Sequence, residues 1–341
     1  MFAARVARLP VVLCTSASQS LKSVQHKSVG LARVNLGVRA QHYANQTRLG
    51  AKRAAKARSI KEVAQAPASG TADMMGKGLL LGASAAGIGA LCYYGLGLSS
   101  EVGAIERAAI WPQYVRDRVR STYMYFGMGI AATTASALAM ARNPALLMRI
   151  TPKSWVGALG GMAVIMASGM VTMSVPYTEG MGMKQLAWLG HSGLLGVVLA
   201  PICFMGGPLL IRAACYTAGV VGGLSCVAMC APSDKFLYMG GALAMGLGAV
   251  FAASVGSMFL SPATALGSGL YAVSLYGGLV VFGGFMLYDT QMIMKRAELH
   301  PVHAQRPFDP INSAMSIYMD TINIFIRIAS ILAGGGGGKR K

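Results

Sequence analysis

The chain has 341 residues, of which 54% are hydrophobic and only 12% are charged. Soluble domains carry about 25% charged residues, so this composition excludes a soluble domain and indicates a polytopic membrane protein. The net charge of +19 is concentrated near the N-terminus, because twelve of the 30 Lys and Arg residues precede the first acid, Glu62. Aromatic residues do not alternate with these basic residues as a nucleic-acid-binding face would need, so no nucleic-acid partner is expected.

Residues 1–59 are rich in Arg, Ser and Ala and contain no acid. They also lack an uninterrupted apolar segment followed by a small-residue cleavage site. This pattern is typical of a mitochondrial presequence and not of a secretory signal. The alternative is a basic disordered arm that stays attached to the protein.

Import should remove much of this presequence and leave a mature N-terminus between about 40 and 60. Sequencing the N-terminus of the protein purified from mitochondria checks the prediction. An intact Met1 in that material would contradict it.

Eight hydrophobic segments follow, each close to the roughly 20 residues that a helix needs to span a bilayer. Of the prolines in this part of the chain, Pro201 alone falls inside a segment, so we expect it to kink or end that helix. Glycines four residues apart, as in Gly157/Gly161 and Gly219/Gly223, predict close helix packing inside the bundle. The predicted spans are 79–98, 121–141, 155–175, 186–206, 209–231, 236–260, 269–294 and 311–332.

The first segment is set apart by a loop at 99–120, whereas the other connections are mostly short. We therefore predict an all-α polytopic membrane protein. It would have an accessory helix with its linker at 60–120, a seven-helix core at 121–333 and a flexible basic tail at 334–341. Basic residues are nearly balanced between the two sets of loops, so loop charge does not orient the chain. The presequence and the even number of spans would place both termini in the matrix.

The last segment carries polar residues at spacings of three and four, which places them on one stripe of a helix. In lipid, such a stripe should face the bundle interior or a water-filled cavity, so this helix is predicted to be central. The alternative is an amphipathic helix that lies on the membrane surface. The stripe consists of Ser313, Ser316, Asp320, Asn323, Arg327 and Ser330.

Asp289 and Asp320 are the only acids inside the predicted spans. A carboxylate at bilayer depth costs about 2.5–3.5 kcal/mol, so neither residue is expected there by default. Their helices follow one another through a loop, so the two carboxyl groups can face each other. Two such groups in a low dielectric cannot both ionise cheaply, and the pair would then share a proton or, when deprotonated, bind a divalent cation such as calcium.

Neutral oxygen ligands for this cation would come from Asn323, Ser316 and Thr290. The alternative is that one aspartate is satisfied by Arg327 or by the backbone and serves only as structural glue between helices.

The run LYGGLVVFGGFMLYDTQMI at 275–293, followed by 317–332 with its embedded MDTIN, resembles the transmembrane BAX-inhibitor-motif family. The presequence, the extra first helix and the positions of both aspartates are similar to those of its mitochondrial inner-membrane member. The YDTQ tetrad in an apolar helix is the most specific part of the resemblance. The family implies a seven-helix core, a central last helix and a pH-sensitive di-aspartate pair, here Asp289 and Asp320.

The resemblance also implies calcium leak or calcium/proton exchange, roles in cristae organisation and apoptosis control, and contact with cytochrome c. Bacterial members lock the aspartate pair with an arginine in the second core helix. Residues 155–175 contain no Arg or Lys. Arg327 is the candidate substitute.

The leading hypothesis is a mitochondrial inner-membrane transporter that exchanges calcium for protons, with no cofactor and no enzymatic activity. The competing hypothesis is a non-transporting scaffold that organises cristae and binds partner proteins, with the aspartates as interhelical glue. An intramembrane aspartyl protease would also use two aspartates. Its glycine-containing GxGD motif is absent before Asp320, which disfavours that class.

Overall fold

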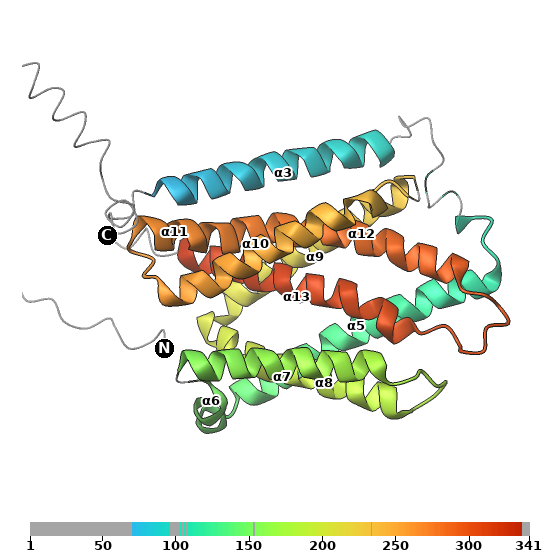
Figure 1. Cartoon of the computed structure of the whole chain (residues 1–341), viewed down its shortest axis with the longest axis horizontal. Helices are drawn as coiled ribbons and strands as arrows, with labels where there is room; N and C mark the ends of the chain where they lie inside the picture. Colours follow the sequence, from blue (N-terminus) through green and yellow to red (C-terminus); the bar gives the residue numbers. More distant parts are fainter. Residues whose placement is uncertain are drawn as a thin grey trace, which may run out of the picture. The chain divides into compact units, whose positions relative to one another are not determined.

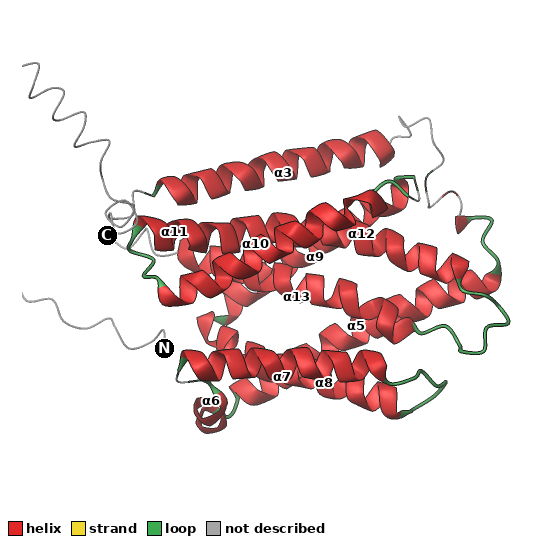
Figure 2. Ribbon diagram, in the orientation of Figure 1, coloured by secondary structure: helices red, strands yellow, loops and turns green. Residues whose placement is uncertain are grey.

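The computed structural model of the chain describes residues 70–95, 103, 106, 108–152, 154–232 and 234–335. The predicted presequence and the basic tail from residue 336 onward lie outside these residues. Helices make up nearly all of the described part, which contains no strand (Figure 2). Eight helical segments in it are long and apolar enough to cross a membrane, which confirms the predicted polytopic all-α class.

Seven of these spans are each built on one α-helix, two of them with a short 3₁₀ segment at one end, and the eighth is interrupted by a π-helical segment. The 3₁₀ segment η2, Leu237–Met239, directly precedes α10. α8 is followed by the short 3₁₀ segment η1, Ala200–Met205. The single helices are α3 (Thr71–Gly95), α5 (Gln113–Ala141), α7 (Trp155–Ser174), α8 (Met183–Leu199), α9 (Gly207–Cys230), α10 (Gly240–Phe259) and α13 (Pro310–Gly335). The interrupted span consists of α11 (Ala265–Ala272), the π segment η3 (Val273–Gly277) and α12 (Gly278–Leu299).

Several boundaries differ from the sequence prediction, since α3 begins at Thr71 instead of residue 79 and the interrupted span runs from Ala265 to Leu299 instead of 269–294. The charged residues predicted to form the end of a loop instead begin α5, which starts at Gln113 directly after Pro112. The reason is tertiary, because the guanidinium of Arg118 donates to the carbonyl oxygens of Ala297 (3.0 Å) and His300 (2.8 Å) at the end of α12. A short helix, α6 (Pro144–Ile150), also occupies part of the connection between α5 and α7.

Pro201 acts as predicted, since α8 ends at Leu199 and the chain continues as the short 3₁₀ segment. Three of the four paired glycines make no close contact with another helix. A Cβ added at Gly161 or Gly219 would meet nothing within 4 Å, and at Gly157 the closest atom belongs to nearby Pro152. The close approach between α5 and α8 comes from Gly196, where an added Cβ would lie 2.4 Å from the carbonyl oxygen of Thr133.

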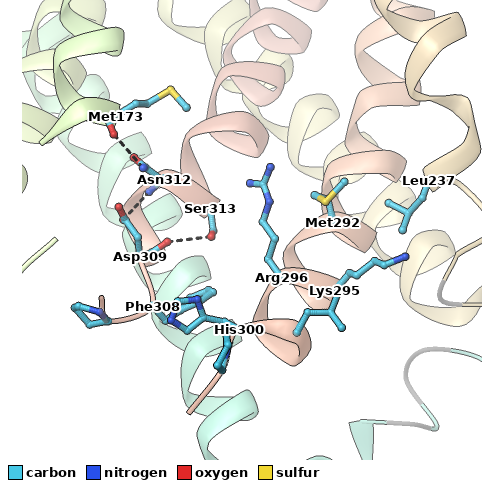
Figure 3. A pocket seen from close by; sticks show the side chains of 13 residues that line it. Met173, Leu237, Met292, Lys295, Arg296, His300, Phe308, Asp309, Asn312 and Ser313 are labelled. Carbon is cyan, nitrogen blue, oxygen red and sulfur yellow. Dashed lines mark hydrogen bonds between the residues drawn. The ribbon is translucent and has the colours of Figure 1, made fainter. Parts of the chain in front are cut away.

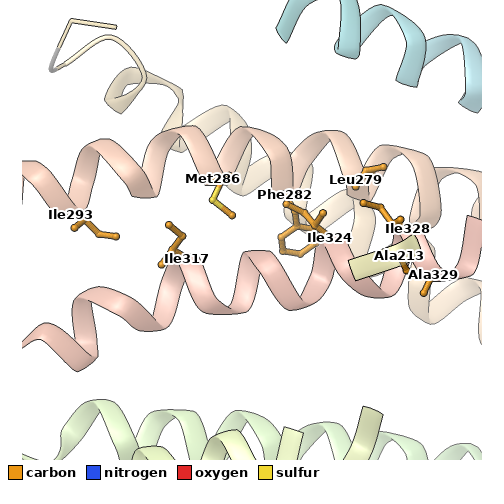
Figure 4. Packing of buried hydrophobic residues seen from close by; sticks show 9 residues of the cluster. All are labelled: Ala213, Leu279, Phe282, Met286, Ile293, Ile317, Ile324, Ile328 and Ala329. Atoms are coloured by element: carbon orange, nitrogen blue, oxygen red, sulfur yellow. The ribbon is translucent and has the colours of Figure 1, made fainter. Parts of the chain in front are cut away.

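The last helix, α13, is central (Figure 1). It packs against α12, α5 and α9, so it is not a surface helix. Its apolar residues interdigitate with those of α12, as Ile317 and Ile324 do with Met286 and Phe282 (Figure 4). Burying a large apolar side chain contributes about 1.5–3 kcal/mol when the alternative is water, but in lipid the gain comes mainly from packing. The contact between α12 and α13 therefore fixes how the polar residues of both helices face each other.

Candidate functional site

The structure brings Asp289 of α12 and Asp320 of α13 together. Their side chains are 8% and 6% exposed, and their carboxyl groups lie within hydrogen-bonding reach of one another. Ser316, one turn before Asp320 on α13, places its hydroxyl near the carboxyl group of Asp289. The predicted pair thus exists as a buried contact between two adjacent helices.

One oxygen of this pair has no donor. Oδ2 of Asp320 is fully buried and receives no hydrogen bond from any group in the described part of the chain. An unsatisfied buried carboxylate oxygen is costly, and a proton held between two adjacent carboxyl groups removes that cost. The geometry therefore fits a pair that holds a shared proton when no cation is bound.

Three of the predicted supporting residues lie elsewhere. Thr290 is next to Asp289 in the sequence but is rotated toward α9, where its hydroxyl lies 3.4 Å from that of Ser225 and donates to the carbonyl oxygen of Met286 at 2.7 Å. Asn323 donates to the carbonyl oxygen of Met319 at 2.9 Å. Of the residues predicted from sequence to support the pair, only Ser316 touches it.

Arg327 does not pair with either aspartate. Its guanidinium donates to the carbonyl oxygen of Ser274 (3.2 Å) and to the backbone and side-chain oxygens of Asn323 (3.1 and 3.0 Å), and it lies 4.5 Å above the ring of Phe282. All of these partners are neutral. A cation at bilayer depth costs about 2.5–3.5 kcal/mol, so an arginine held only by neutral groups calls for an explanation.

A pocket opens where α12 ends and α13 begins (Figure 3). Its volume is about 790 Å³, and its polar lining includes Arg296, Asp309 and Ser313. We call it the vestibule, and the end of the bundle where it lies the vestibule face. Met292 and Ser313 line it and lie one helical turn from Asp289 and Ser316 respectively, so the vestibule reaches to within one turn of the pair.

Arg296 in the vestibule was not singled out by the sequence, since it looked like a loop charge. Its guanidinium makes no hydrogen bond or ion pair with any described residue, and its charge acts electrostatically on Asp289. Side chains of a helix point back toward its N-terminus, so Arg296 extends toward the pair two turns deeper. A signal was present, because Asp289 and Arg296 are seven residues apart and share one helix face.

An ion pair between a buried lysine and a partly exposed aspartate (23% exposed) fixes the start of α13 at the rim of the vestibule. The fully buried side chain of Lys184 lies with Nζ 2.5 Å from Oδ2 of Asp309 and donates to the carbonyl oxygen of Val175 at 2.8 Å. The other oxygen of Asp309 accepts from the backbone N–H of Asn312 at 2.9 Å, which caps the helix. An Asp directly before Pro310 is a recognisable helix-start signal, but its partner on α8 is not visible in the sequence.

The described helices match a known family model. Residues 115–337 match the family described as "Inhibitor of apoptosis-promoting Bax1", a range that includes both aspartates and excludes α3. The chain belongs to this family.

Two relatives show how far the similarity extends. The chain is 52% identical over 303 residues to the growth hormone-inducible transmembrane protein of Rattus norvegicus, a match that covers 88% of each chain. It is 31% identical over 166 residues to Bax inhibitor 1 of Homo sapiens, covering 47% of this chain and 65% of the relative. The first match extends beyond the family range, so it includes sequence outside the shared core.

The most specific part of the family resemblance, the YDTQ tetrad, has two separate roles. Asp289 faces Asp320. Gln291 is 1% exposed and holds the connection between α9 and α10 in place. Its amide nitrogen donates to the carbonyl oxygens of Ala228 (3.1 Å) and Pro232 (2.7 Å), and its amide oxygen accepts from the N–H of Phe236 at 2.8 Å. The sequence analysis did not separate this structural residue from the titratable one.

The site has few ligands for a resident metal. The described residues hold no group of three or more His, Cys, Asp or Glu side chains. Four carboxylate oxygens and the hydroxyl of Ser316 fall short of the six to eight oxygens (roughly) that calcium takes, so water would complete the shell. Such an incomplete site fits a passing cation better than a permanently bound one.

Proposed function

We propose that this protein is a cation transporter of the mitochondrial inner membrane that exchanges calcium for protons at the Asp289–Asp320 pair. The observation that carries the proposal is the close approach of two buried carboxyl groups on two candidate membrane spans, where one oxygen accepts no hydrogen bond from the described residues. In this state the pair shares a proton. Release of that proton creates the negative charge that binds the cation, so proton and cation exclude one another.

The vestibule supports the proposal because it supplies an approach to the pair. Ser313 in its lining belongs to the polar stripe that continues on the same face of α13 through Ser316 to Asp320. Arg296 in the vestibule supplies a counter-charge for Asp289 when the pair is deprotonated and empty. That role would otherwise fall to the arginine that the second core helix of this chain lacks. Arg327 is less suited to it, because Asn323 and the carbonyl oxygen of Ser274 already hold its guanidinium.

Calcium flux into liposomes that contain the purified protein tests the proposal. We expect flux that rises with pH on the vestibule face, because the cation binds only after the shared proton leaves. Replacing Asp320 with Asn keeps size and polarity but removes the titratable group. This variant should lose at least ~tenfold of the pH-dependent flux, equivalent to about 1.4 kcal/mol.

The matched control is Asp117→Asn, the same substitution at an exposed carboxylate outside the vestibule, which accepts a hydrogen bond from Gln113. This variant should keep its flux. Unchanged flux in Asp320→Asn would contradict the transporter. Absence of flux in the unsubstituted protein, together with loss of normal cristae in cells that lack it, would favour the scaffold instead.

The family resemblance extends the proposal to cristae organisation, apoptosis control and contact with cytochrome c. We place these roles downstream of ion exchange. We propose neither an enzymatic activity nor a resident cofactor for this protein.

A further inference from the structure

Arg327 lies on the side of the aspartate pair that is remote from the vestibule. It is seven residues after Asp320 on α13, which is about 10 Å along the helix axis and on the same face. Ser313, which lines the vestibule, lies seven residues before Asp320. The polar stripe of α13 therefore runs from the vestibule past the pair to a single positive charge.

The fold provides a seat for this charge. Gly278, the first residue of α12, leaves the space that the guanidinium fills, since a Cβ added there would lie 2.0 Å from Nε of Arg327. The π-helical turn just before it directs the carbonyl oxygen of Ser274 to the same nitrogen. π-Helical turns often occur at functional sites. In a regular α-helix the carbonyl oxygen of Ser274 would accept a backbone hydrogen bond within the helix, whereas here it accepts from Arg327.

A purely structural role between helices does not explain why this position carries a buried positive charge. No carboxylate in the described part of the chain pairs with it, although Asp320 is only two turns away. A neutral side chain would fill the same space without the cost of burying a cation. The remaining explanation is that the positive charge itself is needed at this point of the stripe.

We propose that Arg327, seated against Gly278, Ser274 and Phe282, is a plug that closes the aspartate pair to the membrane face opposite the vestibule. This inference rests on the proposed function and adds the membrane face from which ions reach the pair. Ions reach the pair through the vestibule, and the guanidinium repels cations and fills the route beyond the pair. Exchange across the membrane then requires the guanidinium to leave its seat.

Alanine substitutions at two neighbouring glycines distinguish displacement of the plug from general damage to the helix. Gly278→Ala pushes the guanidinium out of its seat without changing any charge. Gly277→Ala is the matched control, because its added Cβ would meet only Val273 at an ordinary 3.8 Å. Arg327→Gln removes the charge and guards against a Gly278→Ala variant that fails to fold.

The readout is access of water to the pair from each face, measured without any flux. All six native cysteines are replaced, and Ser316→Cys places a thiol beside the pair. A positively charged, membrane-impermeant thiosulfonate reagent is applied to each face of sealed membrane vesicles, since only a hydrated thiol reacts. Val302→Cys, at an exposed position between α12 and α13, reports which face is the vestibule face.

We expect Cys at position 316 to react from the vestibule face only, in the parent protein and in Gly277→Ala. In Gly278→Ala and in Arg327→Gln it should also react from the opposite face, at a rate raised by about tenfold or more once the nearby charge has moved. Reaction from the opposite face in the parent protein would overturn the plug. Unchanged sidedness in both variants, or no reaction from either face in any variant, would do the same.

The outcome is independent of calcium transport. One-sided access that Gly278→Ala makes two-sided supports the plug even if liposomes show no calcium flux, in which case the proposed ion is wrong. Calcium/proton exchange without one-sided access keeps the transporter and removes the plug.

Discussion

Replacing Asp289 and Asp320 together with asparagine should reduce pH-dependent calcium flux no further than replacing either one alone. The two carboxyl groups lie within hydrogen-bonding reach of one another, and Oδ2 of Asp320 accepts no hydrogen bond from any residue that the structure describes. If they share one proton and jointly bind one cation, neither works without its partner. Each single variant should therefore lose at least ~tenfold of the flux, and the double variant should be strongly non-additive.

A double-mutant cycle measured on proteoliposomes decides this point. The comparison cycle combines Asp320→Asn with Asp117→Asn, an exposed carboxylate outside the vestibule, and there the effects should simply add. Additive losses for Asp289 and Asp320 would contradict the shared proton, even if each residue proved essential. The protein would then use two separate carboxylates.

The second large effect is expected at the buried ion pair that starts α13. Asp309→Asn keeps the helix cap, because Asn caps as well as Asp, but it leaves the fully buried ammonium of Lys184 without a counter-charge. Breaking one side of a buried pair costs about 3–5 kcal/mol. The melting temperature of the purified protein in detergent should fall accordingly, by roughly 2–4 °C for each kcal/mol.

Two further variants control for this result. Lys184→Met combined with Asp309→Asn removes both charges and should recover much of the stability, because no unpaired charge stays buried. Asp234→Asn breaks an ion pair whose side chains are 42% and 56% exposed, and it should leave the melting temperature nearly unchanged because water screens exposed charges. Equal destabilisation by Asp309→Asn and Asp234→Asn would contradict the structural role assigned to Lys184.

Both effects bear on the same end of the bundle. Asp309 lines the vestibule and also fixes the first turn of the helix that carries Ser316 and Asp320. A loosened start of α13 would therefore shift the site as well as lower stability. Measuring flux and melting temperature on the same variants separates the two consequences, since Asp320→Asn should change flux while leaving the ion pair intact.

The sequence alone determined the membrane spans and the identity of the two titratable residues. Spans can be read from local composition because every backbone group in lipid must bond within its own helix, so a continuous apolar run is sufficient to define one. Acids inside such runs are rare because they are costly, which singled out Asp289 and Asp320. The spacing of the polar residues placed them on one face of α13, because helical periodicity is also a local property.

The tertiary structure decided which residues stand beside the pair. Thr290 is adjacent to Asp289 in the sequence, yet a turn of about 100° per residue directs it to Ser225 on α9. Ser316 reaches Asp289 only because α13 packs against α12 in one register. Lys184 meets Asp309 from 125 positions away, and Arg327 is held by Gly278 and Ser274 of a neighbouring span. Such contacts depend on the rotation and register of packed helices, which the periodicity of one helix cannot specify.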